Sequence, residues 1–423
     1  MINRWQWIST QLGKKLWIKS AGFALGGVGL AFAGIIGEPY FPEELRLPTA
    51  EGAARNILNI LATSMLAVTT FSLSIMVTAF SGASSVSPRA TDLLMADQTS
   101  HNVLAIFIGA FLFGLAGLII LHMGFYDDRD EFVLFVVAIL MVVAVVIAIL
   151  RWVDHLTTFG RMGDTINRLE QATIHALKDR LKNPFLGGVP LIGDNKIPQQ
   201  SHTIFATDIG YVDFFDAQKI QHLAEKAQAN FYIDALPGSF VHYGAALLYS
   251  DKLVDEHLQQ EIQAAFSIGR TRNFLQDPRF GIAVMTEVAC RAVAGDLSDS
   301  GTPIDLIGRM VRVLSHLMER KDAKTADIRF TRIHVPAINI GEYFDDFFPP
   351  LARDSGNLIE VHIRLHKALN ALQALEDTEI TQQVERVRGI ALEYAEVSLT
   401  LKRDIEHLQS IANYYSKTLI ACT

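Results

Sequence analysis

The sequence has little cysteine: two residues, Cys290 and Cys422, in a chain of 423. Two thiols so far apart are too few for a disulfide framework or a zinc site, and they suit a reducing compartment. Basic residues are fewer than acidic ones, 37 Lys and Arg against 45 Asp and Glu, so the formal net charge is −8. No basic stripe interleaves with aromatic residues, so the composition argues against a nucleic acid as partner.

The motifs of common enzyme classes are missing. The chain holds no GxxxxGK[ST] phosphate loop, no GxSxG nucleophile elbow and no HExxH zinc motif. His362 and His366 stand at i and i+4, a spacing that a metal could use, but no third ligand is near in the sequence. We interpret this pair as part of an exposed helix face. We therefore expect no enzymatic activity, no cofactor and no metal site.

The chain does have long uncharged apolar runs, nearly all of them before Arg151. A bilayer core needs ~20 apolar residues per helix. The first and third runs are rich in glycine, including a Gly22-xxx-Gly26 spacing that would let another helix approach closely. The fourth is bulky and apolar, as expected of a lipid-facing helix. Four transmembrane spans are predicted, at about 18–36, 55–80, 103–123 and 132–152.

Lysine and arginine lie near one set of span ends, whereas the other connections are mainly acidic. By the positive-inside rule, the basic side is cytoplasmic. This orientation puts the N-terminus, the second connection and the large C-terminal part in the cytoplasm of a bacterium, with the spans in its inner (plasma) membrane. The basic residues are Arg4, Lys14, Lys15, Lys19, Arg89, Arg151, Arg161 and Arg168.

The second span carries hydroxyl groups at an unusual density. With a turn of ~100° per residue, seven polar or small positions fall in one narrow row along the helix, which we call the polar stripe. It consists of Asn56, Thr63, Ala67, Thr70, Ser74, Thr78 and Ser81. The opposite side, which we expect to meet hydrocarbon, holds Leu61, Met65, Leu73, Met76 and Phe80.

Three interpretations of the polar stripe stay open: polar contacts with helices, a water-filled path for ions and a closed pathway for a substrate. The hydroxyls could bond to carbonyls one turn earlier or join helices to one another, contacts worth about 0.6 kcal/mol on average. Alternatively, the polar stripe could line a water-filled path for ions, because uncharged oxygens let small ions exchange hydration water. One such helix per chain cannot enclose a pore, so this interpretation requires a ring of identical subunits. We take five as the number.

The connection around residues 127–131 would form the outer mouth of such a pore. Its acidic residues would concentrate cations if repeated around a ring; they are Asp127, Asp128, Asp130 and Glu131. A solvated loop is the alternative. Nearby His122 could sense external pH, although a capped or interfacial histidine is the simpler interpretation. Ile60 and Phe71 flank the polar stripe and could form an apolar gate.

The segment after the second span, "FSGASSVSPRATDLLMADQTSHNVLAIFIGAFLFG", resembles a bacterial family of predicted membrane proteins, the domain of unknown function 2254 (DUF2254). Two later stretches agree, "GYVDFFDAQKIQHLAEKAQANFYIDALPGSFVHYGAALL" and "RTRNFLQDPRFGIAVMTEVACRAVAGDLSDSGTPIDLI". The resemblance covers roughly residues 15 to 375 and implies an integral membrane protein with a cytoplasmic domain. One departure is "AGDLSDS" at 294–300, where the family tends to carry "SPxINDP".

The rest of the chain is predicted to be a mixed α/β, mainly helical, cytoplasmic domain. The membrane domain covers 1–155, a connecting helix and linker 156–200, a small β-module 201–250 and the mainly helical part 251–423. The β-module resembles the hairpin of biotinyl and lipoyl domains, but no lysine lies between Phe231 and Ser250 to carry a cofactor. Strand character returns in "DIRFTRIHVPAI". In the turn-rich segment after it, Glu342, Asp345 and Asp346 are expected to be solvated, or to line an inner exit.

These features favour a homo-oligomeric inner-membrane channel for small monovalent cations. Sodium is mildly favoured, because hydroxyl oxygens are hard ligands and the filter sequence of potassium channels is absent. Its partners would be copies of itself, the lipid bilayer and the ions. A secondary transporter is one alternative, although no inverted repeat and no charge inside a span core are visible. A membrane-anchored scaffold or sensor that acts through its cytoplasmic domain is the other.

Overall fold

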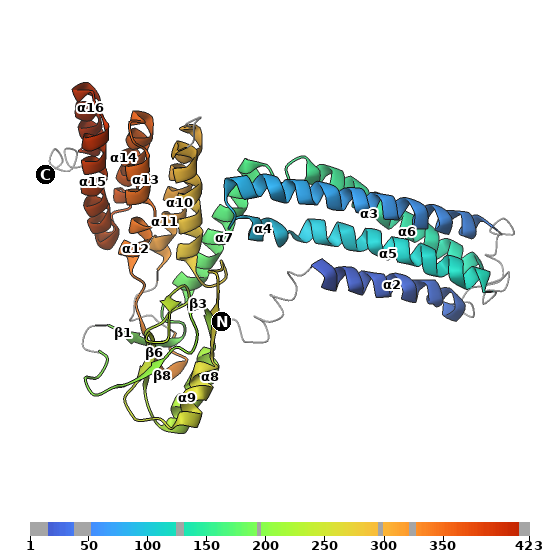
Figure 1. Cartoon of the computed structure of the whole chain (residues 1–423), viewed down its shortest axis with the longest axis horizontal. Helices are drawn as coiled ribbons and strands as arrows, with labels where there is room; N and C mark the ends of the chain where they lie inside the picture. The colour runs from blue at the N-terminus through green and yellow to red at the C-terminus, as the bar shows by residue number, and fades with distance from the viewer. Residues whose placement is uncertain are drawn as a thin grey trace. The chain divides into compact units, whose positions relative to one another are not determined.

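The computed structural model describes residues 16–37, 52–123, 131–192, 196–294, 299–320 and 327–413. Its contacts divide the chain into two compact units, Ile2–Thr165 and Ile166–Thr423. We call these the N-terminal unit and the C-terminal unit (Figure 1).

The N-terminal unit is a bundle of helices. Helix α5 is its centre, because it packs against α2, α3 and α6 and buries much of its length. Figure 1 shows α5 lying between α3 and α2. The elements are α2 (Leu16–Gly37), α3 (Ala53–Val86), α4 (Thr91–Met95), α5 (Gln98–His122) and α6 (Glu131–Leu156).

Three helices in the described part of the chain are long and apolar enough to cross a membrane. They are Ala53–Ser84, Thr91–His122 and Phe132–Leu156, which correspond to the predicted second, third and fourth spans. The predicted first span is helical in α2, but its described apolar stretch, Trp17–Phe32, is shorter. The structure thus has three candidate membrane helices, and a span over 18–36 stays a prediction.

Glycines allow helix backbones to approach closely in this bundle, but not at the spacing that the sequence suggests. A Cβ on Gly27 would overlap the backbone carbonyl of Gly109 in α5. Likewise, a Cβ on Gly114 would overlap the backbone of α3 near Leu58. Gly22 and Gly26, by contrast, have nothing within 4 Å among the described residues. The close contact is therefore made by the neighbouring glycine on another side of α2.

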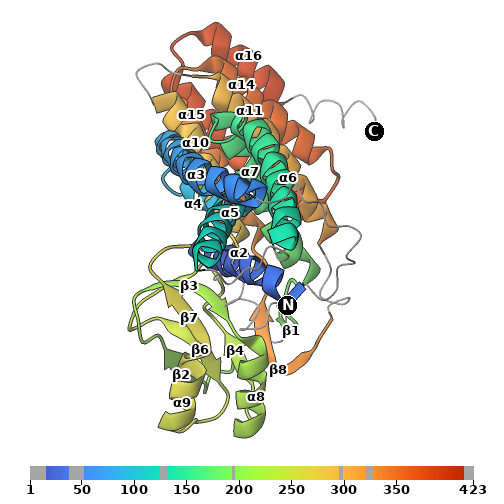
Figure 2. The ribbon, with the colours of Figure 1, turned by 90° about the vertical axis from the view of Figure 1, so that its right-hand side faces the viewer.

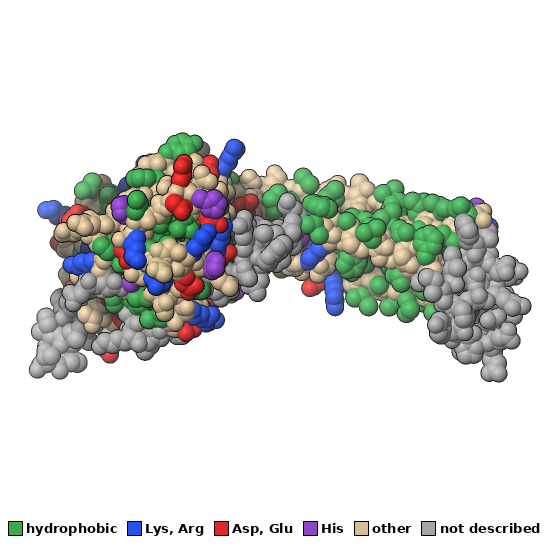
Figure 3. Space-filling model, turned by 90° about the horizontal axis from the view of Figure 1, so that it is seen from below, with side chains coloured by type: hydrophobic (Ala, Val, Ile, Leu, Met, Phe, Trp, Pro, Cys, Tyr) green, Lys and Arg blue, Asp and Glu red, His purple; other side chains and the backbone are tan. Residues whose placement is uncertain are grey.

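The outer surface of the bundle is largely apolar. Helix α6 exposes bulky side chains such as Leu140, Val143 and Leu150 along its length, as expected of the predicted lipid-facing helix. Hydrophobic side chains cover much of the visible surface of the N-terminal unit, whereas charged side chains gather on the C-terminal unit (Figure 3). The two surfaces thus match the division into an apolar and a water-compatible part.

The strands of the C-terminal unit form a five-stranded sheet in the order β1-β8-β4-β6-β2 and a three-stranded sheet in the order β5-β3-β7. The predicted strand near residue 330 is confirmed as β8, which pairs in parallel with both β1 and β4. The strands are β1 (Gly188–Leu191), β2 (His202–Phe205), β3 (Gly210–Phe215), β4 (Phe231–Ile233), β5 (Phe240–Val241), β6 (Ala246–Ser250), β7 (Phe266–Gly269) and β8 (Phe330–Pro336).

The core of this β-region mixes strands with helices. Helices α8 (Ala217–Ala227) and α9 (Glu256–Gln263) lie side by side against the strands (Figure 2). Ile220 of α8, Phe231 of β4 and Val335 of β8 are buried in one hydrophobic cluster. A biotinyl-like module over 201–250 is not confirmed, because this core also draws on segments before and well after that range.

The remaining helices form the larger part of the C-terminal unit, and their amphipathic faces bury leucine, valine and phenylalanine against one another. The helical part near the C-terminus is interrupted at Leu399, where the backbone becomes extended. The elements are α7 (Met162–Lys182), α10 (Pro278–Ala294), α11 (Gly301–Ser315), the 3-10 turn η4 (His316–Glu319), α12 (Ile340–Asp345), α13 (Phe348–Asp354), α14 (Ile359–Gln373), α15 (Thr378–Ser398) and α16 (Lys402–Ala412).

A buried carboxylate joins α7 to α11. Glu170 accepts hydrogen bonds from Arg309 at 2.6 Å and from Arg312 at 2.7 and 3.1 Å. Burial would raise the pKa of Glu170, but the hydrogen bonds from Arg312 and Arg309 outweigh it and lower the pKa below its ordinary 4.5. Because the folded pKa is lowered, the stabilisation is complete above pH 4.5 and is lost as the pH falls through the folded pKa.

We expect Glu170→Gln to lower the free energy of unfolding of the C-terminal unit by about 3 kcal/mol at pH 7, because two arginines lose their carboxylate. The variant should also lose part of the acid sensitivity of the wild type. Chemical unfolding measured at pH 7 and below pH 4.5 tests both statements. Asp305→Asn is the control: its carboxylate pairs with the same Arg309 but is half exposed, so its loss should cost less than about 1 kcal/mol. Equal costs would contradict the prediction.

Candidate functional site

The polar stripe lies on the outer face of α3. All seven of its residues are exposed in the single chain. Buried residues of α3, such as Leu58 and Ala62, lie on the side that packs against the rest of the bundle. The polar stripe is therefore not used to join α3 to the other helices of its own subunit.

Four of the five hydroxyl groups of the polar stripe donate to carbonyls within α3 itself. Thr63 donates to the carbonyl of Asn59 at 2.7 Å, and Thr70 to that of Leu66 at 2.9 Å. Ser74 and Thr78 donate in the same way, at 3.1 and 3.0 Å, to the carbonyls one turn earlier. A hydroxyl has two acceptor lone pairs besides its hydrogen. These acceptors stay available to a water, an ion or a donor on the outside.

Apolar side chains border the polar stripe on both sides. Ile60 and Phe71, the predicted gate residues, are 62% and 68% exposed on one side, and Leu73 and Val77 are exposed on the other. The row of oxygens thus runs along the middle of the exposed face of α3.

The opposite side of α3 differs from the sequence interpretation. Leu61, Met65 and Met76 do not face hydrocarbon, because they are buried within their own subunit. The physical reason is that α3 packs against α5 and α6, so its most apolar side is buried inside the bundle.

The predicted outer mouth lies mostly outside the described residues. Asp127, Asp128 and Asp130 are not among them, and for Glu131 the structure describes only the backbone, at the start of α6. His122 is exposed in the last turn of α5, where its Nδ1 lies 2.7 Å from the carbonyl oxygen of Leu118. This contact is the capped arrangement that the sequence interpretation favoured for His122.

A buried polar cluster connects the start of α5 to the end of α6. His155 Nε2 lies 3.0 Å from the carboxylate of Asp97, which also accepts from the Ser100 hydroxyl at 2.6 Å and its backbone N–H at 2.7 Å. Sequence analysis missed this cluster, although Asp97 directly before an apolar helix is a recognisable N-cap. Its contacts fix the relative positions of two candidate membrane helices.

The histidine pair of the C-terminal unit does not lie on an exposed helix face, so that interpretation is wrong. His362 and His366 are both fully buried in α14. Burial lowers the pKa of His366 to about 3, which keeps its imidazole neutral. The helix buries this face because α14 packs against α11, α15 and α16. Among the described residues, no group of three or more His, Cys, Asp or Glu side chains is placed to hold a metal ion.

The acidic segment after β8 is a helix and its carboxylates are paired, although Glu342 and Asp345 stay about half exposed to solvent, as expected. Asp346 pairs with Arg279 at 2.7 Å, Glu342 contacts the same guanidinium, and Asp345 pairs with Arg386 at 2.7 Å. The segment forms α12 and is held by arginines of α10 and α15. The sequence concealed this pairing because the arginines lie far away along the chain.

A family model described as "Predicted membrane protein (DUF2254)" matches residues 13–371. This range covers most of the chain. The chain belongs to this family. The predicted resemblance is thereby confirmed, and with it the assignment to the predicted membrane proteins.

Two mycobacterial proteins are similar to this DUF2254 chain: the uncharacterized protein Mb1321c of Mycobacterium bovis and the uncharacterized protein Rv1290c of Mycobacterium tuberculosis. Each is 23% identical over 346 residues, which cover 78% of this chain and 66% of the relative. The chain thus spans just under two thirds of the length of these curated relatives. No solved structure matches it.

Proposed function

We propose that this DUF2254 protein is one subunit of a ring-shaped homo-oligomer that conducts small monovalent cations across a bacterial inner membrane. Helix α3 lines the pore. The observation that carries the proposal is the exposure of every polar-stripe residue on a candidate membrane helix whose exposed neighbours are apolar. The proposal assigns no enzymatic reaction and no cofactor to the chain.

Lipid is an unfavourable neighbour for the polar stripe. Moving a hydroxyl from water to an apolar medium without a compensating hydrogen bond costs roughly 2–7 kcal/mol. The bonds to the helix carbonyls reduce this cost but leave the oxygen acceptors unsatisfied. Water or a polar partner therefore suits this face better than hydrocarbon. Repetition of α3 around a symmetry axis supplies water along the whole polar stripe, because the facing copies present the same oxygens.

We choose a ring of about five subunits to close such a pore, and we propose sodium as the favoured ion. In this arrangement Ile60 and Phe71 flank the path as an apolar gate, and hydrophobic constrictions are known to gate by dewetting.

The proposed orientation places the N-terminus and the C-terminal unit in the cytoplasm, with α2 as a fourth span. It is supported by Lys19, whose Nζ donates to Asn102 Oδ1 at 3.1 Å near the start of α5. The buried Asp97–His155 pair brings the end of α6 to the same end of the bundle. Arg89 and Arg151 belong to segments near that end, so the positive-inside rule favours the cytoplasm for it.

The oligomeric state of the purified full chain in detergent tests the first requirement. Light scattering or native mass spectrometry should give a multiple of the 46.8 kDa subunit, about five. A monomer under conditions that preserve the fold would refute the channel proposal, because one polar stripe cannot enclose a pore.

Reconstitution into planar bilayers tests conduction. We expect unitary current steps whose reversal potential follows the sodium gradient and not the chloride gradient. A secondary transporter gives no unitary steps, and a scaffold or sensor gives no current at all. Either result would replace the channel by the corresponding alternative.

The double replacement Asp127→Asn and Asp128→Asn tests the proposed acidic mouth. We expect lower cation conductance at low salt and little change at high salt, because mobile ions screen a ring of carboxylates over ~10 Å at 0.1 M. Single-channel recording at two salt concentrations measures the effect. If the double variant and the wild type have the same conductance at each of the two salt concentrations, these two carboxylates have no such role.

A further inference from the structure

The C-terminal unit contains a cavity of about 400 Å³. Its walls come from the turn at Pro237–Ser239, the start of α10, the end of α7 and the segment that joins β8 to α12. This volume lies within the range of ~300–1,000 Å³ typical of small-molecule sites. The residues that decide its chemistry are Arg180, Arg272, Arg279, Asp277, Glu342 and Tyr343.

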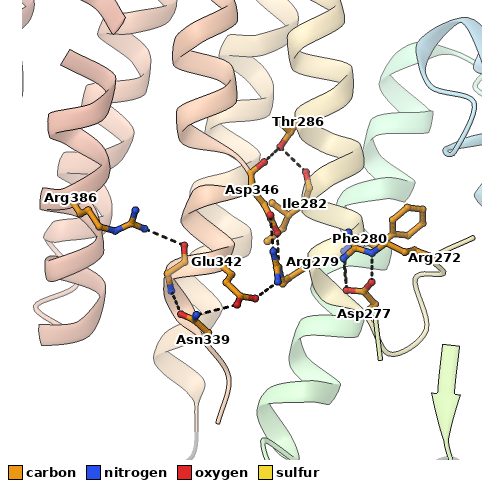
Figure 4. A network of polar contacts seen from close by, with 11 residues as sticks. Arg272, Asp277, Arg279, Phe280, Ile282, Thr286, Asn339, Glu342, Asp346 and Arg386 are labelled. Atoms are coloured by element: carbon orange, nitrogen blue, oxygen red, sulfur yellow. Dashed lines mark hydrogen bonds and ion pairs between the residues drawn. The ribbon is translucent and has the colours of Figure 1, made fainter. Parts of the chain in front are cut away.

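Two of the three arginines in the cavity wall are already neutralised. Arg272 makes two hydrogen bonds to Asp277, at 2.6 and 2.9 Å. Arg279 makes two to Asp346, at 2.7 and 3.0 Å, and also contacts Glu342. Figure 4 shows both pairs near the start of α10. Two carboxylates of the wall, Asp277 and Glu342, are thus occupied by these guanidinium groups, and the third, Asp234, is exposed.

Arg180 differs from its neighbours. It is 8% exposed, and within the described part of the chain its guanidinium has no hydrogen bond and no ion pair. The nearby Asp277 is paired with Arg272 and also accepts from the backbone N–H of Phe280 at 3.1 Å. Burial lowers the pKa of Arg180, while Tyr343 and Asp277 act in the opposite direction.

A second donor without a partner lies in the same wall. Tyr343 is 4% exposed, and its hydroxyl has no hydrogen-bond partner among the residues the structure describes. Burial raises the pKa of Tyr343, so the phenol stays protonated and can donate. Buried polar groups in proteins are hydrogen-bonded as a rule, and buried charges are paired. No donor atom of Arg180 or Tyr343 is among the fully enclosed atoms without a partner in the described part of the chain, so both side chains open to the cavity, where an acceptor from outside can reach them.

We propose that this cavity binds a small organic anion whose phosphate or carboxylate group pairs with Arg180 and accepts a hydrogen bond from Tyr343. A guanidinium matches both oxyanions through two parallel N–H donors. The cavity is larger than a lone phosphate, and the polar side chains of Ser239 and Asn339 together with Pro237 and Ile338 can hold the remainder of the molecule. The site does not depend on the channel proposal.

Calorimetric titration of the full chain in detergent tests the site with three probes: inorganic phosphate, AMP and succinate. We expect AMP or succinate to bind more tightly than about 1 mM, and inorganic phosphate more weakly because it leaves most of the cavity empty. Binding of AMP alone identifies a phosphate ligand, and binding of succinate alone a carboxylate ligand. If neither binds in this range, the proposal fails.

The variant Arg180→Met should bind the probe about 10- to 100-fold more weakly, since hydrogen bonds to charged groups are among the strong ones. It should also raise the unfolding temperature of the ligand-free protein by about 2–4 °C or more, because a buried unpaired charge is removed. If Arg180 instead stabilised the fold, its replacement would lower the unfolding temperature. A lower unfolding temperature, or unchanged affinity, would overturn the proposal.

Tyr343→Phe keeps the ring and removes only the hydroxyl, so it tests the site if Arg180→Met fails to fold. We expect binding about 10- to 100-fold weaker, the range of one hydrogen bond to a charged group. Arg329→Met is the matched control, because Arg329 is exposed, pairs with Asp327 at 2.7 Å and does not line the cavity. Equal losses in Arg329→Met and Arg180→Met, or full affinity in Tyr343→Phe, would contradict the assignment.

Discussion

Replacing Ser74 by Leu should abolish the unitary cation current of the reconstituted protein. Ser74 lies in the middle of the polar stripe and is exposed, so each subunit of a ring would place one isobutyl group in the water path. Every ~1.4 kcal/mol added to the barrier lowers the flux of ions about tenfold, and the substitution is repeated around the ring. Single-channel recording of wild type and variant at equal protein density measures the loss.

Two neighbouring threonines provide the matched control. Thr70→Val removes a hydroxyl from the polar stripe at nearly constant shape, and Thr69→Val makes the same change one residue away, where the hydroxyl is half-buried and bonded to the carbonyl of Met65 at 2.6 Å. We expect Thr70→Val to lower the conductance and Thr69→Val to leave it intact. Full current in Ser74→Leu, or equal effects of the two valines, would move the conduction path away from α3.

Replacing Gly27 by Ala should destabilise the N-terminal unit by about 1–3 kcal/mol, the usual cost of overpacking. The added methyl group would overlap the backbone carbonyl of Gly109, and a backbone contact cannot be relieved by turning a side chain. Helices α2 and α5 would have to separate. Thermal unfolding in detergent, followed by circular dichroism or by the accessibility of engineered cysteines, measures the effect.

Gly22→Ala is the control for this prediction, because the same substitution in the same helix meets nothing within 4 Å among the described residues. It should leave the unfolding temperature unchanged or raise it slightly, since alanine favours a helix over glycine by about 1 kcal/mol. Destabilisation of similar size in both variants would mean that the close contact of α2 is made on its other face.

Features carried by local periodicity could be predicted from the sequence. The apolar runs of α3, α5 and α6 exceed the length that a bilayer needs, and the placement of polar residues around α3 depends only on the helical turn. For this reason the seven residues of the polar stripe share one exposed face of α3. Which apolar side of α3 packs within its own subunit could not be predicted, because the answer lies in α5 and α6.

Features that depend on distant partners were missed. His362 and His366 were expected on an exposed helix face, yet both are buried in α14, which packs against α11, α15 and α16. Arg180 looks like an ordinary basic residue in the last turn of α7, and only the fold shows it buried beside a cavity in which Asp277 is paired with Arg272. No spacing in the sequence joins residue 180 to residue 343.

Helix α3 is 34 residues long and contains no proline, so it is a rod of about 51 Å, well over the ~30 Å of hydrocarbon in a bilayer. In a stiff rod of this length, a rotation of about five degrees around one end moves the other by roughly 4 Å. That displacement exceeds the diameter of a water molecule. A small rotation of α3 about one end would therefore be enough to widen or close an aqueous passage along it.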